Sequence, residues 1–344
     1  MSLFKSLSSA LKDGLADLEG DRASSSGHHQ EQQHASSSGS PTATLGSALN
    51  GTHRALFIGI NYTGSKAELR GCHTDVQNIS TFLFQRFPAF SVANSLFLVD
   101  KPGTQPQSMP TRTNIIAAMK WLVKDARAGD SLFIHYSGHG TSANDVDGDE
   151  EDGKDEALVP VDYETAGLIV DDDIHRLLCD QIPEGARLTA LMDCCHSGTM
   201  LDLPYMYTPQ GDLSIAEVNR TAKASLGDIK EGLDLLKGKN KTDGGAGTPP
   251  QKSAAQEKTE RERTTKGDVI SFSGCRDDQT SADAQINNAF SGAMSWALIK
   301  TLTESSHDLT YTDLLRDMRK HLHGKYTQVP QRTCSFICCL LVDH

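Results

Sequence analysis

Long hydrophobic runs are missing from this sequence. No stretch of about eighteen consecutive apolar residues occurs, which is the length that a membrane-spanning helix needs. The N-terminus lacks a compact hydrophobic region followed by a small-residue cleavage site, so no secretory signal is visible. The eight cysteines stand at irregular spacings, which is unlike a disulfide framework and suits a reducing compartment. We therefore expect no membrane span and an intracellular location, in the cytoplasm or the nucleus.

The sequence also lacks an excess of basic residues. Its 33 basic and 45 acidic residues give a net charge of −12, which argues against nucleic acid or anionic lipid as a partner. The excess is local, because residues 145–173 contain 13 acidic residues and one basic residue, Lys154. The remaining acidic and basic residues cancel. This single acidic stretch therefore needs an explanation of its own.

Residues 1–50 lack the apolar content of a folded domain. Residues 21–50 are of low complexity, with Ala-Ser-Ser-Ser-Gly occurring twice, and we expect this region to be disordered. Ahead of it, apolar residues recur at helical spacing and predict a short amphipathic helix over residues 2–18. This helix could dock on its own domain or fray, or it could bind a partner or a membrane surface. The apolar residues are Leu3, Phe4, Leu7, Leu11, Leu15 and Leu18.

From Arg54 onward, strands alternate with helices. Apolar runs predict strands at residues 55–61, 95–99, 131–136, 187–192 and 268–273. Helical spacing predicts helices over residues 76–87, 115–126 and 172–179, a later one carrying Phe290, Met294, Ala297 and Leu298, and another carrying Leu314, Leu315, Met318 and Leu322. This order predicts an α/β fold with a mainly parallel central sheet and helices on both faces.

The folded region divides into two parts. Residues 51–207 form a large part, and residues 267–344 form a small part that we expect to belong to the same fold. Between them, residues 208–266 are rich in Lys, Gly, Thr, Glu and Gln and show little apolar periodicity. This segment is far longer than an ordinary loop, so we interpret it as an exposed, flexible insertion.

Two of the predicted strands end on reactive residues. The third strand runs into His139, and the fourth runs into Cys195. Functional residues of open parallel sheets gather at the carboxyl ends of strands. A thiolate nucleophile needs a nearby imidazole that removes its proton and later protonates the leaving group. The pair therefore indicates a cysteine nucleophile activated by a histidine.

These motifs together resemble those of the metacaspases, of the type I-like form without a zinc-finger region, since no cysteine precedes residue 72. The resemblance rests on residues 54–62, 71–75, 135–140, 193–198, 203–205 and 279–283. It implies a caspase-like fold, Cys195 as nucleophile and His139 as base. It also implies an oxyanion hole formed by the backbone N–H groups of Gly140 and Cys195. Cys194 is expected to pack below the site.

The charges near this site predict the substrate preference. A pocket that selects Arg or Lys must place carboxylates beside a buried cation. Asp193, two residues before Cys195, is well placed for this role. The resemblance adds Asp75 and Ser137 as substrate-binding residues, although Asp75 could instead interact with the dipole of its own helix. We expect cleavage after Arg or Lys, whereas a preference for Asp is disfavoured.

The acidic stretch suits a hard cation with oxygen ligands. An EF-hand is rejected, because Glu150 occupies the position of the invariant glycine. The resemblance instead implies a calcium site formed by Asp155, Asp171, Asp172 and Asp202. Residues 145–152 would then be a solvated loop. We expect calcium to activate the enzyme.

The sequence thus predicts a calcium-activated cysteine endopeptidase with polypeptide substrates. The resemblance implies a monomer, made as a zymogen, with a part in programmed cell death. The insertion carries exposed basic residues at which such an enzyme could cleave itself, although it could equally be a spacer. The alternative is a metacaspase-like scaffold in protein-aggregate handling with little proteolytic role. Beyond Gln331 the sequence departs from the family pattern, so its last strand is uncertain.

Overall fold

The structure is a computed structural model, which describes most of the chain from residue 49 onward. The predicted helix over residues 2–18, the loop at 145–152, Cys195 and most of the 208–266 insertion lie outside the described residues. The described residues are 49–144, 154–194, 200–207, 213–215, 264–274, 283–286, 289–305, 309, 311–323 and 330–335.

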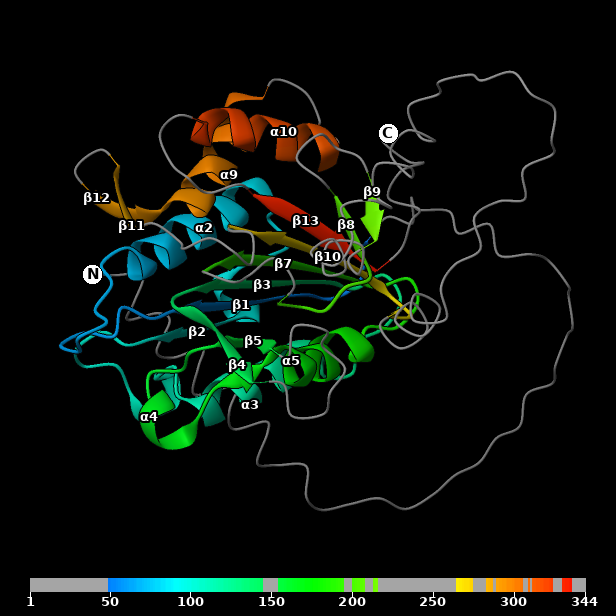
Figure 1. The fold of residues 1–344 in the computed structure, drawn as a ribbon. Coiled ribbons are helices and arrows are strands. Elements are labelled where there is room, and N and C mark those ends of the chain that lie inside the picture. The colour runs from blue at the N-terminus through cyan, green and yellow to red at the C-terminus, as the bar shows by residue number, and fades with distance from the viewer. Residues whose placement is uncertain are drawn as a thin grey trace, which may run out of the picture.

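A central sheet runs through the molecule (Figure 1). Within the described residues its strand order is β2-β1-β3-β7-β10-β13-β8-β9. The first five strands in this order are parallel, and the last three pair antiparallel. The strands are β1 (His53–Gly59), β2 (Ser95–Val99), β3 (Ser131–Ser137), β7 (Arg187–Asp193), β8 (Tyr205–Tyr207), β9 (Leu213–Ile215), β10 (Asp268–Ser273) and β13 (Gln331–Cys334).

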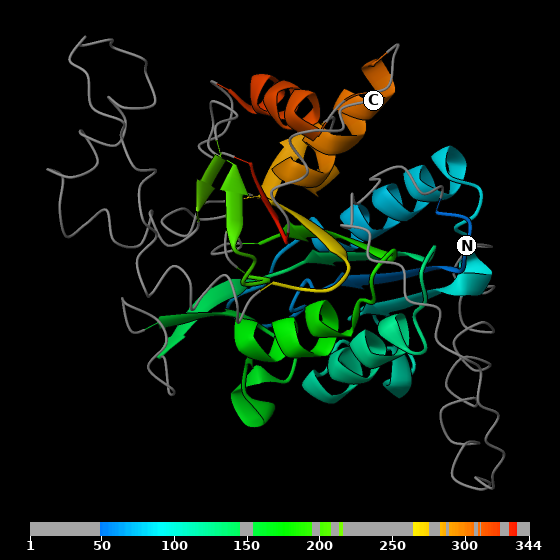
Figure 2. The same cartoon turned by 90° about the vertical axis from the view of Figure 1, so that its right-hand side faces the viewer.

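Helices cover both faces of this sheet, as Figures 1 and 2 show. One face carries α3 (Arg112–Val123), the short α4 (Tyr163–Ala166) and α5 (Asp171–Leu178), and the other carries α2 (Cys72–Arg86), α9 (Ala293–Glu304) and α10 (Tyr311–Leu322). The predicted α/β architecture is therefore confirmed. No helix among the described residues is long and apolar enough to cross a membrane.

The apolar runs of the strands explain this two-sided arrangement. Successive side chains of a strand point to opposite faces, so a strand buried on both faces must be apolar throughout. In β1, Leu56 and Ile58 pack in the cluster with α3 and α5. Ala55 and Phe57 pack in the cluster with α2, α9 and α10, where the Phe57 ring stacks on Phe97 with centroids 4.8 Å apart.

The structure corrects one expectation from the sequence and adds a small sheet that the sequence did not predict. Phe290 lies in strand β12 (Ala289–Gly292), which pairs with β11 (Asp283–Ile286), and α9 begins only at Ala293. Part of the acidic stretch forms the small antiparallel sheet of β4 (Gly140–Asn144), β5 (Lys154–Leu158) and β6 (Ile169–Val170). This sheet places acidic residues of β5 beside α5.

The region after the insertion completes the central sheet. β10 pairs with β7 in parallel, and β13 pairs with β10 antiparallel. The last strand that the sequence left uncertain is therefore present as β13. The cysteines of the described residues are all buried; they are Cys72, Cys179, Cys194 and Cys334.

Candidate active site

Two buried tyrosines hold the backbone of His139, directly after β3. The Tyr62 hydroxyl accepts a hydrogen bond from the His139 N–H at 3.0 Å and donates one to the Val159 carbonyl at 2.6 Å. The Tyr136 hydroxyl donates to the His139 carbonyl at 2.8 Å. Burial raises the pKa of both phenols, so each stays protonated and keeps its hydrogen for donation. The backbone position of His139 is thereby fixed from both sides.

The imidazole of His139 has a defined orientation and tautomer. Its ring packs against Tyr62 with centroids 4.7 Å apart. Its Nε2 lies 2.8 Å from the Ala67 carbonyl oxygen. Because a carbonyl can only accept, Nε2 must carry the hydrogen in this contact. Nδ1 is then the nitrogen with the free lone pair, and it is the atom that can act as a base.

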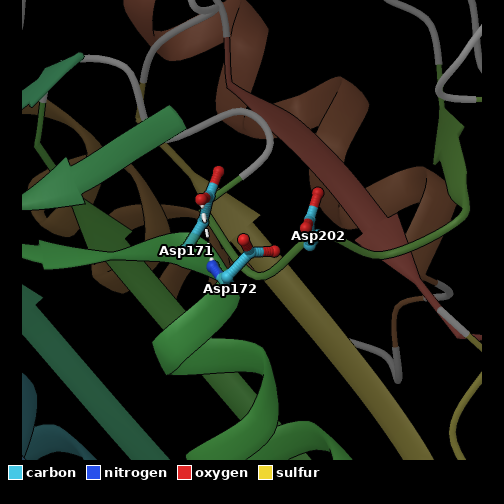
Figure 3. Close-up of side chains that lie close together, drawn as sticks. All are labelled: Asp171, Asp172 and Asp202. Carbon is cyan, nitrogen blue, oxygen red and sulfur yellow. Dashed lines mark hydrogen bonds between the residues drawn. The ribbon is translucent and has the colours of Figure 1, made fainter. Parts of the chain in front are cut away.

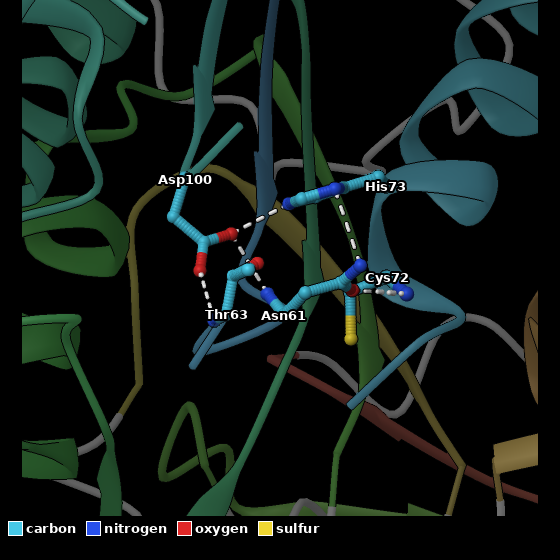
Figure 4. Close-up of polar contacts among 5 residues, drawn as sticks. All are labelled: Asn61, Thr63, Cys72, His73 and Asp100. Carbon is cyan, nitrogen blue, oxygen red and sulfur yellow. Dashed lines mark hydrogen bonds and ion pairs between the residues drawn. The ribbon is translucent and has the colours of Figure 1, made fainter. Parts of the chain in front are cut away.

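A polar network anchors the loop that follows β1 and carries Ala67 (Figure 4). Asp100 lies 2.5 Å from the His73 Nε2 and accepts from the backbone N–H groups of Asn61 and Thr63. The Asn61 side chain in turn accepts from the Cys72 N–H at 3.1 Å. Burial opposes ionisation of Asp100, but these hydrogen bonds and His73 outweigh it and lower its pKa.

Two carboxylates meet at the start of α9. Asp75, from α2, is fully buried and accepts hydrogen bonds from the Ser137 hydroxyl at 2.7 Å and from the Gly292 N–H at 2.8 Å. Asp193 is 3% exposed and accepts from the Ser295 N–H at 2.8 Å. The helix N-terminus provides a favourable field for both carboxylates. Asp75 thus interacts with α9 and not only with its own helix.

The three predicted substrate-binding residues are brought together by the strand register. Ser137 and Asp193 are partners in the pairing of β3 with β7. A Cβ added to Gly292 would lie 2.2 Å from Asp193 Oδ2 and 2.9 Å from Asp75 Oδ2. These two oxygens are therefore within about 5 Å of each other. Only glycine leaves room for both carboxylates at this point.

A buried histidine lies close to this cluster. His135, on β3, is completely buried, and its Nε2 lies 3.3 Å from the Ser295 hydroxyl. Burial lowers the pKa of His135 to about 3, so it is neutral at physiological pH. Sequence reasoning did not single out His135 or Gly292, because neither stands out without the contacts made by α9.

Three of the four predicted metal ligands lie together. Oxygens of Asp171, Asp172 and Asp202 lie within 4.8 Å of one another, as Figure 3 shows. Asp202 adopts a left-handed backbone with φ of +52°, and the preceding Leu201 carbonyl is 2.8 Å from the His175 Nδ1. Asp155 is buried on β5 but does not belong to this group within the described part of the chain.

Glu156 is an acidic neighbour that the sequence reasoning missed. Its backbone N–H donates to Asp171 at 3.0 Å, and the two side chains share a hydrogen bond. Burial, then the charges of Asp202 and Glu156, raise the pKa of Asp171 to about 9. The sequence offered no reason to choose Glu156 over Asp155 as a neighbour of Asp171. Strand β5 was not predicted, so the face to which each of the two side chains points was unknown.

The predicted nucleophile, Cys195, lies outside the described residues. The register still relates it to His139, because Ser137 and Asp193 are paired and each precedes its catalytic candidate by two residues. Gly140, the predicted oxyanion donor, begins β4 directly after His139. Cys194 is fully buried in the core cluster on the α3 and α5 side. The assignment of Cys195 stays a prediction.

Comparisons with known proteins agree with this geometry. Residues 53–204 match the family model described as metacaspase, peptidase C14 domain. Metacaspase-1 of Cryptococcus neoformans is 46% identical over 297 residues, which cover 84% of this chain and 64% of that protein. Metacaspase-1A of Aspergillus oryzae is 45% identical over 310 residues, 86% of this chain and 71% of that protein. Metacaspase-1 of Ajellomyces capsulatus is 45% identical over 300 residues, 84% of this chain and 81% of that protein.

A solved structure shares the fold. The crystal structure of a Geobacter sulfurreducens protein superposes with a TM-score of 0.52 at 24% identity, covering 83% of this chain and 94% of that one. The sequence comparisons place the chain in a family of cysteine peptidases, and the solved structure supports the fold alone. The chain belongs to the metacaspases. The predicted family is confirmed, and so is the predicted α/β fold with its mainly parallel central sheet.

Removing the Tyr62 hydroxyl tests whether it fixes His139. In Tyr62→Phe, the partly buried N–H of His139 loses its acceptor, which should lower the free energy of unfolding by about 1–3 kcal/mol. Chemical denaturation measures this. Tyr163→Phe is the matched control, because its hydroxyl makes only an exposed contact, at 3.5 Å, with Glu164. An equal effect of the two substitutions would contradict the proposed role of Tyr62.

The raised pKa of Asp171 predicts how stability depends on pH in metal-free buffer. The folded state keeps this proton to about pH 9, whereas the unfolded chain loses it near 3.8. Stability present below about pH 4 is therefore lost as the pH rises to about 9. Denaturation in chelator across this range should show a smaller loss for Asp171→Asn than for wild type. Glu164→Gln, at an exposed position, should follow wild type, and three identical pH profiles would refute the prediction.

Proposed function

We propose that this protein is a calcium-activated cysteine endopeptidase that cleaves after Arg or Lys. Cys195 is the nucleophile and His139 the general base and acid. The observation that carries the specificity is the buried pair Asp75 and Asp193. Asp193 stands two residues before Cys195, and Asp75 is hydrogen-bonded to Ser137, which stands two residues before His139. We further propose that it acts as a monomer in the cytoplasm or nucleus.

The orientation of His139 supports its role as a base. Nε2–H is engaged by the Ala67 carbonyl, so Nδ1 is free to take the Cys195 proton. The resulting thiolate attacks the scissile carbonyl carbon, and the oxyanion accepts hydrogen bonds from the N–H groups of Gly140 and Cys195. The imidazolium then protonates the leaving amine. Water, activated by the same imidazole, hydrolyses the acyl-enzyme and restores the thiol.

Charge supports the preference for basic residues. Asp75 and Asp193 are buried with their oxygens within about 5 Å of each other, and they accept hydrogen bonds from the Ser137 hydroxyl and from backbone N–H groups at the start of α9. A guanidinium or ammonium from the substrate would compensate two carboxylates in a site of low dielectric. A substrate Asp would add a third negative charge there. The same geometry therefore favours Arg and Lys and rejects Asp.

The residues of the acidic cluster fit calcium. Calcium takes oxygen ligands at about 2.3–2.6 Å, so ligands of one ion can lie about 5 Å apart. The oxygens of Asp171, Asp172 and Asp202 satisfy this spacing. The raised pKa of Asp171, caused in part by other carboxylates, indicates a site with excess negative charge. We propose that these three residues and Asp155 hold the ion, with Glu156 as a further candidate.

The position of the cluster supports a regulatory role. β5, which carries Asp155 and Glu156, pairs with β4, and β4 follows His139 directly. Asp202 comes seven residues after Cys195 in the sequence. A bound cation would supply charge neutralisation between these segments. The acidic residues of β5 and Asp202 would then hold the segment after His139 and the segment after Cys195 in one arrangement.

Peptide reporters test activity, specificity and calcium dependence in one experiment. We expect wild type with millimolar calcium to hydrolyse Arg- and Lys-ending reporters at least about a hundredfold faster than the Asp-ending one, because of the buried carboxylates. Cys195→Ala should be inactive in every condition. Preferred hydrolysis after Asp would contradict the specificity, and equal rates in excess chelator and in calcium would contradict the activation.

The insertion is proposed as a site of self-processing. It carries Lys and Arg residues that a protease with basic preference can cut: Lys223, Lys230, Lys237, Lys239, Lys241, Lys252, Lys258, Arg261 and Arg263. Intact-mass spectrometry after calcium treatment should show cleavage after one or more of them in wild type and none in Cys195→Ala. Identical cleavage of both proteins would implicate a contaminating protease, and an uncut wild type would make the insertion a spacer.

A further inference from the structure

An apolar pocket opens on the edge of the molecule opposite to His139. Its volume is about 550 Å³. Its floor includes the amino-terminal halves of β3 and β7, and its walls come from the end of α2, from α9 and from the start of α10. We call it the α2–α9 pocket. The lining residues that matter here are Leu83, Phe87, Phe133, Leu298, Leu302 and Leu314.

The rim of this pocket exposes apolar surface. Phe87 follows directly after α2 and is 45% exposed. No other large hydrophobic residue among the described residues is as exposed. The deeper lining is almost fully buried, with Leu83 at 6% and Leu314 at 8%. Apolar concavities of this size commonly bind a partner or ligand. The pocket is therefore a candidate binding surface, and neither His139 nor the buried carboxylates line it.

The chain itself enters the fold at this pocket. Leu49, the first described residue, lines it, and so does His53 at the start of β1. The residues between them are fixed, because the Gly51 N–H donates to the Gly129 carbonyl at 2.9 Å and the Thr52 N–H donates to Asp130 at 2.7 Å. Everything before residue 49 must therefore leave from the pocket.

The preceding segment carries a matching apolar face. At 100° per residue, Leu3, Phe4, Leu7, Leu11, Leu15 and Leu18 fall within an arc of about 120°. Residues 19–48 form a link of 30 residues. A random-coil chain of 30 residues spans about 30 Å on average, a distance at which docking is intramolecular with a millimolar effective concentration. A weak apolar contact is then sufficient for occupancy.

We propose that residues 3–18 dock as an amphipathic helix in the α2–α9 pocket of their own chain. The apolar face covers Phe87 and the α9 leucines, and the polar face stays in water. Because the pocket lies at the amino ends of the strands, the docked segment leaves the catalytic edge uncovered. The docked segment stabilises the end of α2 and α9 against local unfolding.

Hydrogen exchange on the full chain tests this proposal. Leu7→Asp/Leu11→Asp places charges on the apolar face, and Ser9→Asp/Ala16→Asp places the same charges on the opposite face. We expect the first pair of substitutions to speed amide exchange about tenfold in residues 79–87 and 298–304, and the control pair to match wild type. All substitutions lie outside the described fold. Equal exchange in the three proteins would overturn the proposal.

Photo-crosslinking identifies the occupant of the pocket. A p-benzoylphenylalanine at position 11 should crosslink within one chain to residues 82–90 or 298–302, with a yield independent of protein concentration. Phe87→Ser, at an exposed position, should reduce that yield several-fold while circular dichroism stays unchanged. Crosslinks between two chains, or protection that appears only with lipid vesicles, would overturn docking in its own chain. These readouts do not depend on peptidase activity, so they can fail independently of the proposed function.

Discussion

The parallel pairing of β3 with β7 is the contact on which the candidate site depends. Its register places Ser137 beside Asp193, and each residue precedes a catalytic candidate by two positions. Because side chains alternate along a strand, a slip by one residue would turn one member of each pair to the opposite helix layer. The apolar residues that fill both faces, such as Ile134 and Leu191, make that slip costly. Core packing therefore sets the geometry of the catalytic edge.

The two acidic clusters differ in how the fold compensates their negative charge. Asp75 and Asp193 accept hydrogen bonds from backbone N–H groups at the start of α9. Asp171 stands in the first turn of α5, yet burial and its acidic neighbours hold its pKa far above the usual value. The first cluster is therefore held by hydrogen bonds from the N-terminus of a helix. The other accumulates charge that a proton or a metal ion must offset.

Much of the fold could be predicted from the sequence, because continuous apolar runs have few alternatives. The strands at 95–99 and 268–273 have the predicted bounds, and β3 and β7 differ from prediction by one residue. Phe290 was assigned to a helix because one apolar residue four positions before Met294 fits helical spacing equally well. Only its pairing with Gln285 across β11 and β12 separates the two structures. The spacing of apolar residues in the sequence does not reveal that pairing.

The candidate site was predictable to the extent that single residues carry chemistry. His139, Asp75, Asp193 and the acidic residues stand in recognisable motifs, whereas Tyr62, Gly292 and Glu156 act through tertiary contacts. Tyr62 reaches His139 across 77 positions of sequence, and Gly292 reaches Asp75 across 217. Neither the periodicity of apolar residues nor the spacing of motifs indicates such contacts. They follow from the topology, which brings the carboxyl ends of β1 and β3 and the start of α9 to one edge of the sheet.

Helix α9 joins two places that the sequence keeps apart. Its first turn binds Asp193, and Leu298 and Leu302 further along line the α2–α9 pocket. A helix of 12 residues is about 18 Å long and moves as one body. Occupancy of either end therefore restricts the same rigid element, and any free energy of coupling must be equal in both directions. Helix α9 therefore connects the carboxylates Asp75 and Asp193 with the opposite edge of the sheet.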